Sequence, residues 1–589
     1  MRITTAFLFP ALACALALFA CEGGGGSGGG DADADGDADA DADADADGDA
    51  DTDADADADG GVDGGGDGDA CLDLCVFGEV NGDTGQLCDL WEPDGGPDGG
   101  AWVAIEDGDG HLENRSRRYT SWLRANMEPA GGVMSAIYAD GALGDVVAYG
   151  NVRDSAIWTG TYLAAEALRY LSAGHPEALA HVEQQVRVLH RWFNISGDPG
   201  YLARYAAPAD SPPEIQAIFA ADDPENHRDW AFESGSWHWK GHTSRDQYQG
   251  PLLGYSLAYE ALADEGLREM IRDDVVELVE QLMQVQTHDV SVVIDGVWSF
   301  EAVEAEFQYT VFAPSESGSF NPEILVDPDD LGAVTIQGFQ EFYPDLQPLL
   351  SQLPLLGGLS MPVPRASSAI MLASYFLVAL QVTEGVPAYA ERRAAIEEFY
   401  ETNADAWLDM AEAWSFQKSC GAKYYGTHIA FEPMYNLARL EHDADRRERI
   451  RQDVLADQMW SAGVADHKNV FFAYVRGANP PTGDDPSGLI AFHTEQLAQF
   501  PPAPHVELGT DVSALYAADP ECDGVALEAI DVGLRPVDDY MWQDDPWQLY
   551  GEPVPNRTLN GVDYILAYWL GRHHGFIAPE APVQCLRWR

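Results

Sequence analysis

One short stretch of the chain, SWHWKGHTSRDQYQG at residues 236–250, collects side chains that neither a helix core nor a solvated surface requires. Aromatic rings suit the C–H faces of pyranose sugars, His and Asp side chains can move protons, and an arginine can hold a carboxylate through two hydrogen bonds. This mixture predicts a carbohydrate site in which Asp246 is catalytic. The expected sugar contacts are Trp237, Trp239, His242, Arg245 and Tyr248.

The same stretch also has a purely structural interpretation. It directly precedes a predicted helix, so Ser244 would cap that helix and Asp246 would complement the dipole of its first turn. Arg245 would then pair with a neighbouring acid, and Trp237 and Trp239 would pack. The sequence leaves both interpretations open.

Two more helix starts carry comparable side chains. Asp154 opens the apolar segment RDSAIWTGTYLAAEALRYLSAG, and Trp158 follows four residues later on the same helix face. KYYGTH at residues 423–428 supplies Tyr425 and His428, the pair that a lyase would use to remove a proton beside a uronate carboxylate. First-turn dipole pairing of Asp154 and aromatic packing in the second motif are the structural alternatives.

The C-terminal half adds a loop and one basic residue. RPVDDYMWQDDPW at residues 535–547 combines acids with Trp542, which fits a site rim that contributes an acid or binds a divalent ion, or merely a solvated loop. We expect Trp542 and Arg476, from NVFFAYVRGANP, to contact substrate. The sequence has no HExxH motif, no G-x-S-x-G elbow and no glycine-rich phosphate loop after a strand, so we expect neither a cofactor nor a dedicated metal site.

Repeated helix pairs must position these residues. A largely buried helix that ends at Gly174 is followed by an amphipathic helix that Pro176 opens, and such pairs recur about six times along residues 111–577. This alternation predicts an all-α fold, an (α/α)6 toroid or six-hairpin barrel, in a domain that spans residues 111–589. Residues 288–362 break the pattern with a hairpin signal at Asp295-Gly296, which predicts a small β-containing insertion on the barrel rim.

In this pattern the chain resembles the six-hairpin glycosidase superfamily and the toroid polysaccharide lyases. The resemblance rests on the helix pairs and on RDSAIWTG, HTSRDQYQG, YYGTH and GVDYILAYW at inner-helix starts. It implies a carbohydrate cleft ringed by the N-terminal ends of the inner helices. It also implies that Asp154 and Asp246 are the nearest counterparts of the two aspartates of unsaturated glucuronyl hydrolases, although the flanking residues differ from that family.

The N-terminal segments indicate export. Residues 1–21 combine Arg2, a short apolar run and LFAC, which resembles a bacterial lipobox and predicts lipidation of Cys21; an ordinary signal peptide is the alternative. Glu22 rather than Asp follows, which favours the outer membrane or cell surface. Residues 22–70 alternate Asp with Ala and Gly and predict a disordered acidic tether, because they lack side chains that could stabilise a core. Calcium binding there is the weaker alternative, since a twelfth-position acid is missing.

Charge and cysteine content narrow the class further. The net charge of the chain is −67. Without the 19 acids and one base before residue 71, the chain still has 80 acidic and 31 basic residues. This acidic excess argues against nucleic-acid binding. An irregular segment at residues 71–110 carries Cys71, Cys75 and Cys88; these join Cys420, Cys522 and Cys585. Six cysteines in an exported chain predict disulfides, with an incomplete zinc knuckle as the alternative.

Together these features predict an envelope lipoprotein that hydrolyses glycosidic bonds with Asp154 and Asp246 as a carboxylate pair. The runner-up is a lyase with Tyr425 or His428 as base and Arg245 as neutraliser. The third hypothesis is a surface lipoprotein that binds glycans without catalysis. The predicted partners are a carbohydrate and, through the lipid anchor, a membrane; the sequence predicts no oligomeric state.

Overall fold

The computed structural model describes residues 112–579, except 295–297, 318–322, 327–333, 338, 353–364, 419, 421–423, 502–505 and 538–539. It also describes the backbone of three short strands, β1 (Val80–Asn81), β2 (Gln86–Asp89) and β3 (Ala101–Ala104). The predicted signal peptide, the lipidation site Cys21 and the acidic tether lie outside the described residues.

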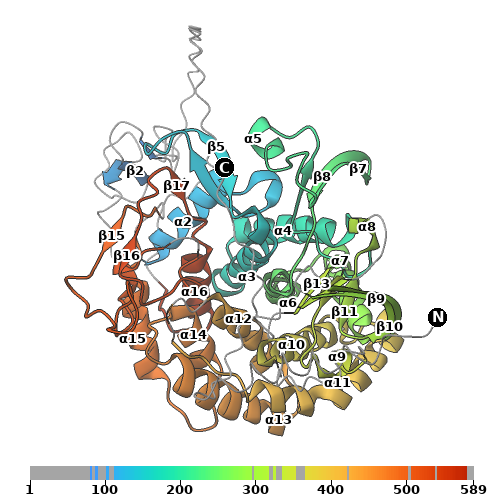
Figure 1. Ribbon diagram of the computed structural model, residues 1–589. Coiled ribbons are helices and arrows are strands. Elements are labelled where there is room, and N and C mark those ends of the chain that lie inside the picture. The colour runs from blue at the N-terminus through green and yellow to red at the C-terminus, as the bar shows by residue number, and fades with distance from the viewer. Residues whose placement is uncertain are drawn as a thin grey trace.

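Two sets of helices make up most of the described chain, and Figure 1 shows one set around the middle with the other outside it. The inner set is α3 (Ser155–Ala173), α6 (Gln249–Ala261), α10 (Ala366–Thr383), α12 (Tyr425–Leu440), α14 (Val470–Ala478) and α16 (Val562–His573). The outer set is α2 (Leu112–Asn126), α4 (Pro176–Asn194), α7 (Glu265–Met283), α11 (Ala390–Ala411), α13 (Ala444–Arg449) with the π-helix η5 (Ile450–Val464), and α15 (Ser487–Leu497).

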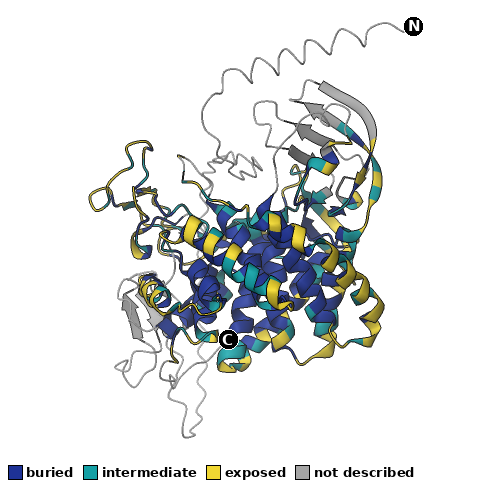
Figure 2. Cartoon of the chain, turned by 90° about the horizontal axis from the view of Figure 1, so that it is seen from below, coloured by how far each residue is buried: buried dark blue, intermediate teal, exposed yellow. Residues whose placement is uncertain are grey.

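The sequence pattern located the first inner and outer pair, α3 and α4, correctly. Gly174 adopts the left-handed conformation (φ 68°) that ends α3, and Pro176 opens α4, as predicted. The fold is therefore mainly helical. Figure 2 shows that buried positions concentrate in the middle of the helical body, whereas exposed positions lie towards its edge.

Each inner helix packs against the next one in the chain, and the last, α16, packs against the first, α3. The outer helices cover the contacts between inner ones: α4 contacts both α3 and α6, α7 contacts both α6 and α10, and α2 contacts α16. One described helix, α10, is long and apolar enough to cross a membrane by length and composition, but 94% of its apolar window is buried inside the fold.

The contact between α3 and α6 is unusually close because glycines line it. A Cβ atom on Gly160 would lie 2.0 Å from the backbone nitrogen of Pro251, and one on Gly250 would lie 2.0 Å from the carbonyl oxygen of Ile157. Both obstacles are backbone atoms, so neither can move aside. Glycine at these positions therefore fixes how the two helix starts approach each other.

The predicted insertion contains the expected strands. Strand β9 (Gln286–Ile294) pairs antiparallel with β10 (Trp298–Phe307) on either side of the predicted turn. β12 (Glu323–Val326) and β13 (Val334–Gln337) extend this sheet, and β11 (Thr310–Phe312) pairs with β14 (Phe339–Glu341). The prediction of a β insertion in a helical fold is thus confirmed.

Further small sheets lie outside the insertion, where the sequence analysis expected none. They are β4 (Ser135–Tyr138) with β5 (Val146–Gly150) and β17 (Arg557–Thr558), β6 (Tyr205–Pro208) with β8 (Gly235–Lys240) and β7 (Asn226–Phe232), and β15 (Thr510–Asp511) with β16 (Tyr550–Gly551). Short helical turns complete the chain: η1 (Pro129–Gly131), η2 (Val152–Asp154), α5 (Pro213–Gln216), η3 (Arg245–Tyr248), α8 (Pro314–Ser317), α9 (Gln347–Leu350), η4 (Pro387–Tyr389) and η6 (Val532–Leu534). The fold is therefore not purely helical, because pairing of distant segments leaves little trace in local sequence.

Candidate functional site

The two predicted catalytic aspartates lie at neighbouring helix starts. Asp154 ends the 3₁₀ turn η2 before α3, and Asp246 lies in η3 before α6; both are partly exposed. The amide of Gln247 donates a hydrogen bond to Asp154 Oδ1 at 3.0 Å, which joins the two turns directly. The close approach of the glycine-lined helices behind them makes this contact possible.

Arg204 also connects the same two turns. Its guanidinium donates to the carbonyl oxygens of Arg153 (2.7 Å) and His242 (2.6 Å), and lies 3.8 Å from the Asp154 carboxylate. It also donates to the hydroxyl of Ser244 at 3.1 Å. The Ser244 side chain therefore binds this arginine and forms no cap hydrogen bond with the helix, although its backbone occupies the N-cap position.

The contacts of other side chains bring further inner-helix starts to the same place. Arg245 donates to Ser368, in the first turn of α10, at 3.0 Å. His428 in the first turn of α12 lies 3.2 Å, nitrogen to nitrogen, from the amide of Gln543, in the loop before α16. The first turns of α3, α6, α10 and α12 and the loop before α16 therefore share one end of the fold.

A closed aromatic cluster lies beneath this rim. Trp158 stacks on Tyr540 with ring centroids 4.3 Å apart, and His428 lies 5.1 Å from Tyr540 and 6.2 Å from Trp158. All three side chains are fully buried. Trp158 and His428 thus support the site from within the fold and present no exposed surface to a substrate.

One buried acid completes this cluster. Glu432, one turn after His428 on α12, accepts a hydrogen bond from the hydroxyl of Thr161 at 2.7 Å, and its other oxygen lies 3.9 Å from His428 Nδ1. Burial, reinforced by the nearby charge of Asp246, raises the pKa of Glu432 to about 8, and burial lowers the pKa of His428 to about 3. Both groups are therefore mainly uncharged at neutral pH.

Several buried polar atoms of the inner helices and of the loop before α16 have no hydrogen-bond partner within the described part of the chain. They are His428 Nε2, Glu432 Oε2, Tyr540 Oη, Trp158 Nε1 and both amide atoms of Gln249. Unpaired polar atoms in a core destabilise a fold, so proteins retain them mainly where they have another use. Similar unpaired atoms occur elsewhere in the fold, for example at Arg115, Trp192 and Trp569, so it is the direct contact between the Asp154 and Asp246 turns that singles out this end of the helices as the candidate site.

Of the remaining predicted residues of the opening stretch, Trp237 and Trp239 have packing contacts and His242 is exposed. Trp237 is half-buried on β8 under the guanidinium of Arg191, 4.6 Å from its ring centre. Trp239 is fully buried and stacks on His227 at 3.7 Å between ring centroids. His242 is exposed in a left-handed conformation (φ 54°).

Tyr248, Trp542 and Arg476 are also held by the fold. The Tyr248 hydroxyl donates to the carbonyl of Gly200 and accepts from a backbone amide, and the Trp542 indole donates to the carbonyl of Asp563. Arg476 lies in the last turn of α14, at the C-terminal end of that helix, and forms an ion pair with Asp484. The geometry favours structural roles for these three side chains, and their predicted sugar contacts stay predictions.

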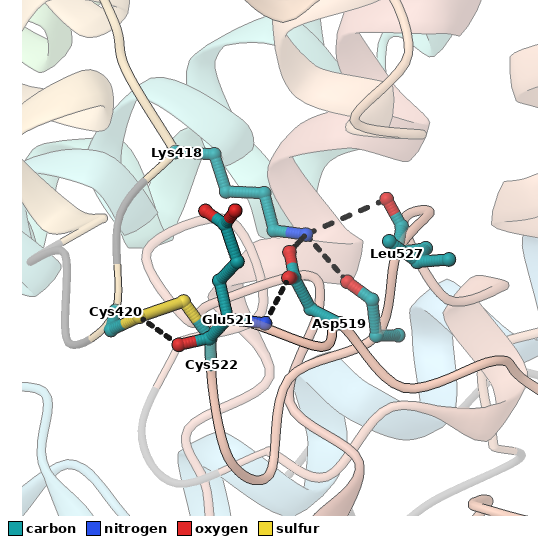
Figure 3. Close-up of a disulfide and its surroundings, with 7 residues drawn as sticks. Lys418, Cys420, Asp519, Glu521, Cys522 and Leu527 are labelled. Carbon is teal, nitrogen blue, oxygen red and sulfur yellow. Dashed lines mark hydrogen bonds and ion pairs between the residues drawn. A yellow bond between two sulfur atoms is a disulfide. The ribbon is translucent and has the colours of Figure 1, made fainter.

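A disulfide fixes the approach to α12. Cys420 and Cys522 are bonded, which confirms the predicted use of two of the six cysteines (Figure 3). Nearby, the ammonium group of Lys418 donates to Asp519 at 3.0 Å and to the carbonyl of Ala526 at 2.6 Å. The disulfide and these hydrogen bonds attach the residues before α12, which begins at the partly exposed Tyr425, to the segment around Asp519 and Cys522 that leads to Gln543.

Sequence reasoning missed Gln247 and Glu432. Gln247 lies inside the highlighted stretch, but an amide beside an aspartate carries no signal of its own. The spacing of His428 and Glu432, four residues apart in HIAFE, was the available clue, since it puts both on one helix face. The apolar neighbours of Glu432 made it look like a packing position.

Comparisons with models of protein families, with curated proteins and with solved structures gave no match. Among the described residues, no group of three or more His, Cys, Asp or Glu side chains is arranged to hold a metal ion. The functional argument therefore rests on the geometry of this site.

Proposed function

We propose that the protein hydrolyses glycosidic bonds, with Asp154 and Asp246 as its carboxylate pair. We also propose that the inner and outer helices form an (α/α)6 toroid, which the contact of α16 with α3 supports. The helix starts that meet at Asp154 and Asp246 would then ring the substrate.

The observation that carries the proposal is the difference between the two carboxylates. Asp154 accepts a hydrogen bond from Gln247 and lies beside Arg204, which favours its ionised form as base or nucleophile. Within the described residues the Asp246 side chain accepts no hydrogen bond, which leaves its partly exposed carboxyl group open to contact with a substrate. Glycosidases need such a pair, in which one group donates the proton while the other acts as an anion.

A lyase receives less support. It needs a free cation to neutralise a uronate carboxylate, but Arg245 lies 3.5 Å from Glu341 and donates to Ser368. It also needs an accessible base, and His428 is fully buried, so this mechanism would depend on Tyr425 alone.

We further propose that the chain is exported and held at the outer membrane or cell surface by a lipid on Cys21. The lipobox-like LFAC and the acidic tether support this proposal. The disulfide between Cys420 and Cys522 also fits an oxidising compartment. Metabolic labelling with a fatty acid, lost in Cys21→Ala, would test the anchor.

A panel of glycans, assayed for reducing ends and for the ultraviolet absorbance of unsaturated products, tests the function. For hydrolysis we expect new reducing ends without absorbance, and Asp154→Asn and Asp246→Asn should each lower kcat by about 10²–10⁴-fold. Asp405→Asn, on the exposed face of outer helix α11, is the matched control and should leave the rate unchanged. If the products absorb in the ultraviolet and Tyr425→Phe abolishes this absorbance, the protein is a lyase and not a hydrolase. Binding without any product would indicate a glycan-binding protein.

A further inference from the structure

We propose that Asp246 shares one proton with the buried carboxyl group of Glu432, and that the hydroxyl of Tyr375 links the two groups. Glu432 is then a positioning residue: it does not touch the substrate, but it keeps a proton available to Asp246, the acid of the reaction. The inference rests on the proposed hydrolase and adds a third carboxyl group to its two aspartates.

Glu432 lies against the start of α6, the helix that directly follows the Asp246 turn. The hydroxyl of Thr161 on α3 contacts Glu432 at 2.7 Å, and a Cβ atom on Gly250 would lie 2.9 Å from that same hydroxyl oxygen. Gly250 is four residues after Asp246, and α12 packs against α6. Thr161 is therefore a common neighbour of the buried acid and of the helix start that carries Asp246.

No side chain in the described part of the chain gives Glu432 a positive charge to pair with. Glu432 is fully buried, and the single proton of the Thr161 hydroxyl is also directed to the carbonyl oxygen of Ile157, at 2.8 Å. His428, at 3.9 Å, is uncharged because burial lowers its pKa to about 3. A carboxyl group in such surroundings keeps its proton.

The hydroxyl of Tyr375, on α10, lies within electrostatic reach of both carboxyl groups. Burial raises the pKa of this phenol, and the charges of Glu432 and Asp246 raise it further. Within the described residues the buried hydroxyl has no hydrogen-bond partner, and neither has the amide of Gln249, three residues after Asp246. A hydroxyl both donates and accepts, so it can stabilise whichever carboxyl group is charged, directly or through a bound water.

Other charged and titratable groups surround the pair. They are Asp154 and Arg204 at the neighbouring turn, His242 and Arg245 beside Asp246, His428 on α12 and Tyr540 before α16. Arg245 opposes the rise in the pKa of Tyr375, whereas Lys418 and Arg535 act on Asp545. All of these groups stay in place when Glu432 alone is replaced, so a comparison with Glu432→Gln isolates the shared proton.

A shared proton changes how the acid responds to pH. Two coupled carboxyl groups lose their protons in steps that belong to the pair. The pair keeps one proton until Glu432 ionises, with a pKa of about 8, so the fraction of molecules with that proton on Asp246 stays constant through neutral pH. An isolated carboxyl group instead becomes about tenfold less protonated with each pH unit above its pKa.

Carbon-13 NMR of the free protein, labelled at the aspartate carboxyl carbons, tests the shared proton without a substrate. The Asp246 signal is assigned by its absence from Asp246→Asn. In the wild-type protein it should shift towards the value of a charged carboxylate in a step near pH 8, and Glu432→Gln should lack this step. Glu128→Gln is the matched control and should keep it, because Glu128 is another buried acid with a raised pKa, of about 7, but lies after α2 beside Arg124.

Kinetics with phenyl and 2,4-dinitrophenyl glycosides of glucose, galactose and mannose test whether the proton is used. A phenyl group needs a proton to leave, so at pH 7.5 Glu432→Gln should lower kcat/KM for its glycosides by about tenfold, with no change at pH 5. A dinitrophenolate leaves without a proton, so its glycosides should react equally with both proteins. A merely structural role of Glu432 would lower both rates.

Tyr375→Phe is the second variant, and it should fold because it removes only an unpaired hydroxyl from the core. A charged Glu432 then loses a hydrogen bond, so kcat/KM for phenyl glycosides at pH 7.5 should fall by about tenfold. Tyr435→Phe is its control: this hydroxyl contacts His574 at 3.0 Å, farther along α12, and its loss should not change the rate.

The outcomes separate the two proposals. An Asp246 signal without a step near pH 8 would overturn the shared proton while leaving a hydrolase in place. Equal losses for both kinds of glycoside would overturn the role of Glu432 in supplying the proton. A step in the NMR titration without hydrolysis of any glycan or probe would overturn the proposed function and, with it, the use of the proton in catalysis.

Discussion

Replacing Glu432 by glutamine is expected to change how the free energy of unfolding depends on pH. Burial, with the charge of Asp246, raises the pKa of this carboxyl from 4.5 to about 8. A raised pKa in the folded state contributes stability that is fully present below pH 4.5 and is lost as the pH rises towards 8. Glutamine resembles the protonated acid and cannot ionise, so the variant should not show this loss.

The size of the effect follows from the two pKa values. They differ by about 3.5, and each pKa unit corresponds to about 1.4 kcal/mol, so the wild-type protein should lose about 5 kcal/mol relative to Glu432→Gln between pH 4.5 and 8. This is a large part of the stability of an ordinary domain. Urea unfolding of both proteins at pH 5, 6.5, 8 and 8.5 measures it.

Glu166 on α3 is the matched control, because it is equally buried but ion-paired. Burial would raise the pKa of Glu166, but Arg169, at 3.2 Å, and His181, at 2.8 Å, outweigh it and lower the pKa. A lowered pKa contributes stability that is present above the unfolded value and lost as the pH falls, so the difference between wild type and Glu166→Gln should have the opposite slope. Glu166→Gln should also destabilise the protein at pH 7, by about 1.5–3 kcal/mol, because Arg169 and His181 lose a buried charged partner while Arg169 keeps Glu177 at 2.6 Å.

The reasoning would be refuted if the stability difference between wild type and Glu432→Gln stayed constant from pH 5 to 8.5. Infrared spectroscopy gives an independent measure. The protonated carboxylic acid band at pH 7.5 should be weaker in Glu432→Gln than in the wild-type protein, to which other buried carboxyl groups with a raised pKa, such as Glu128, also contribute. Equal bands in the two proteins would show that Glu432 is ionised in the fold.

Two further predictions concern stability. Gly250→Ala should destabilise the protein by about 3 kcal/mol or more in urea unfolding, because the new methyl group meets the backbone of α3. Gly488→Ala, in open space at the start of α15, is the control and should be neutral or stabilising. Equal effects of the two substitutions would contradict the close contact between α3 and α6. Removal of the Cys420–Cys522 disulfide by Cys420→Ser should lower stability by about 2–4 kcal/mol, because the bond closes a segment with a sequence separation of 102 residues. An unfolding midpoint equal to that of the wild-type protein in non-reducing buffer would contradict this.

The sequence was sufficient for the helices because their signals are local. Apolar periodicity, Gly174 after α3 and Pro176 before α4 are all encoded within a few residues of the feature they specify. The sheet of β6, β8 and β7 was missed because its strands come from separated segments. The alternation of Trp237 and Trp239 indicated an extended segment, but not the strands that pair with it.

Partner identity could not be predicted for the same reason. Arg245 was expected to be free for a substrate carboxylate, yet Glu341 lies beside it from a strand almost a hundred residues further along the chain. Glu432 looked like an isolated acid in an apolar helix. Only the fold shows that Thr161 of another inner helix donates to it and that Asp246 raises its pKa.

These partners also explain how several carboxyl groups can lie close together at this site. Electrostatic coupling is mutual, so a charge on Glu432 would repel the charge on Asp246 as strongly as Asp246 disfavours ionisation of Glu432. Protonation of Glu432 removes that repulsion, and Gln247 and Arg204 offset the charge of Asp154.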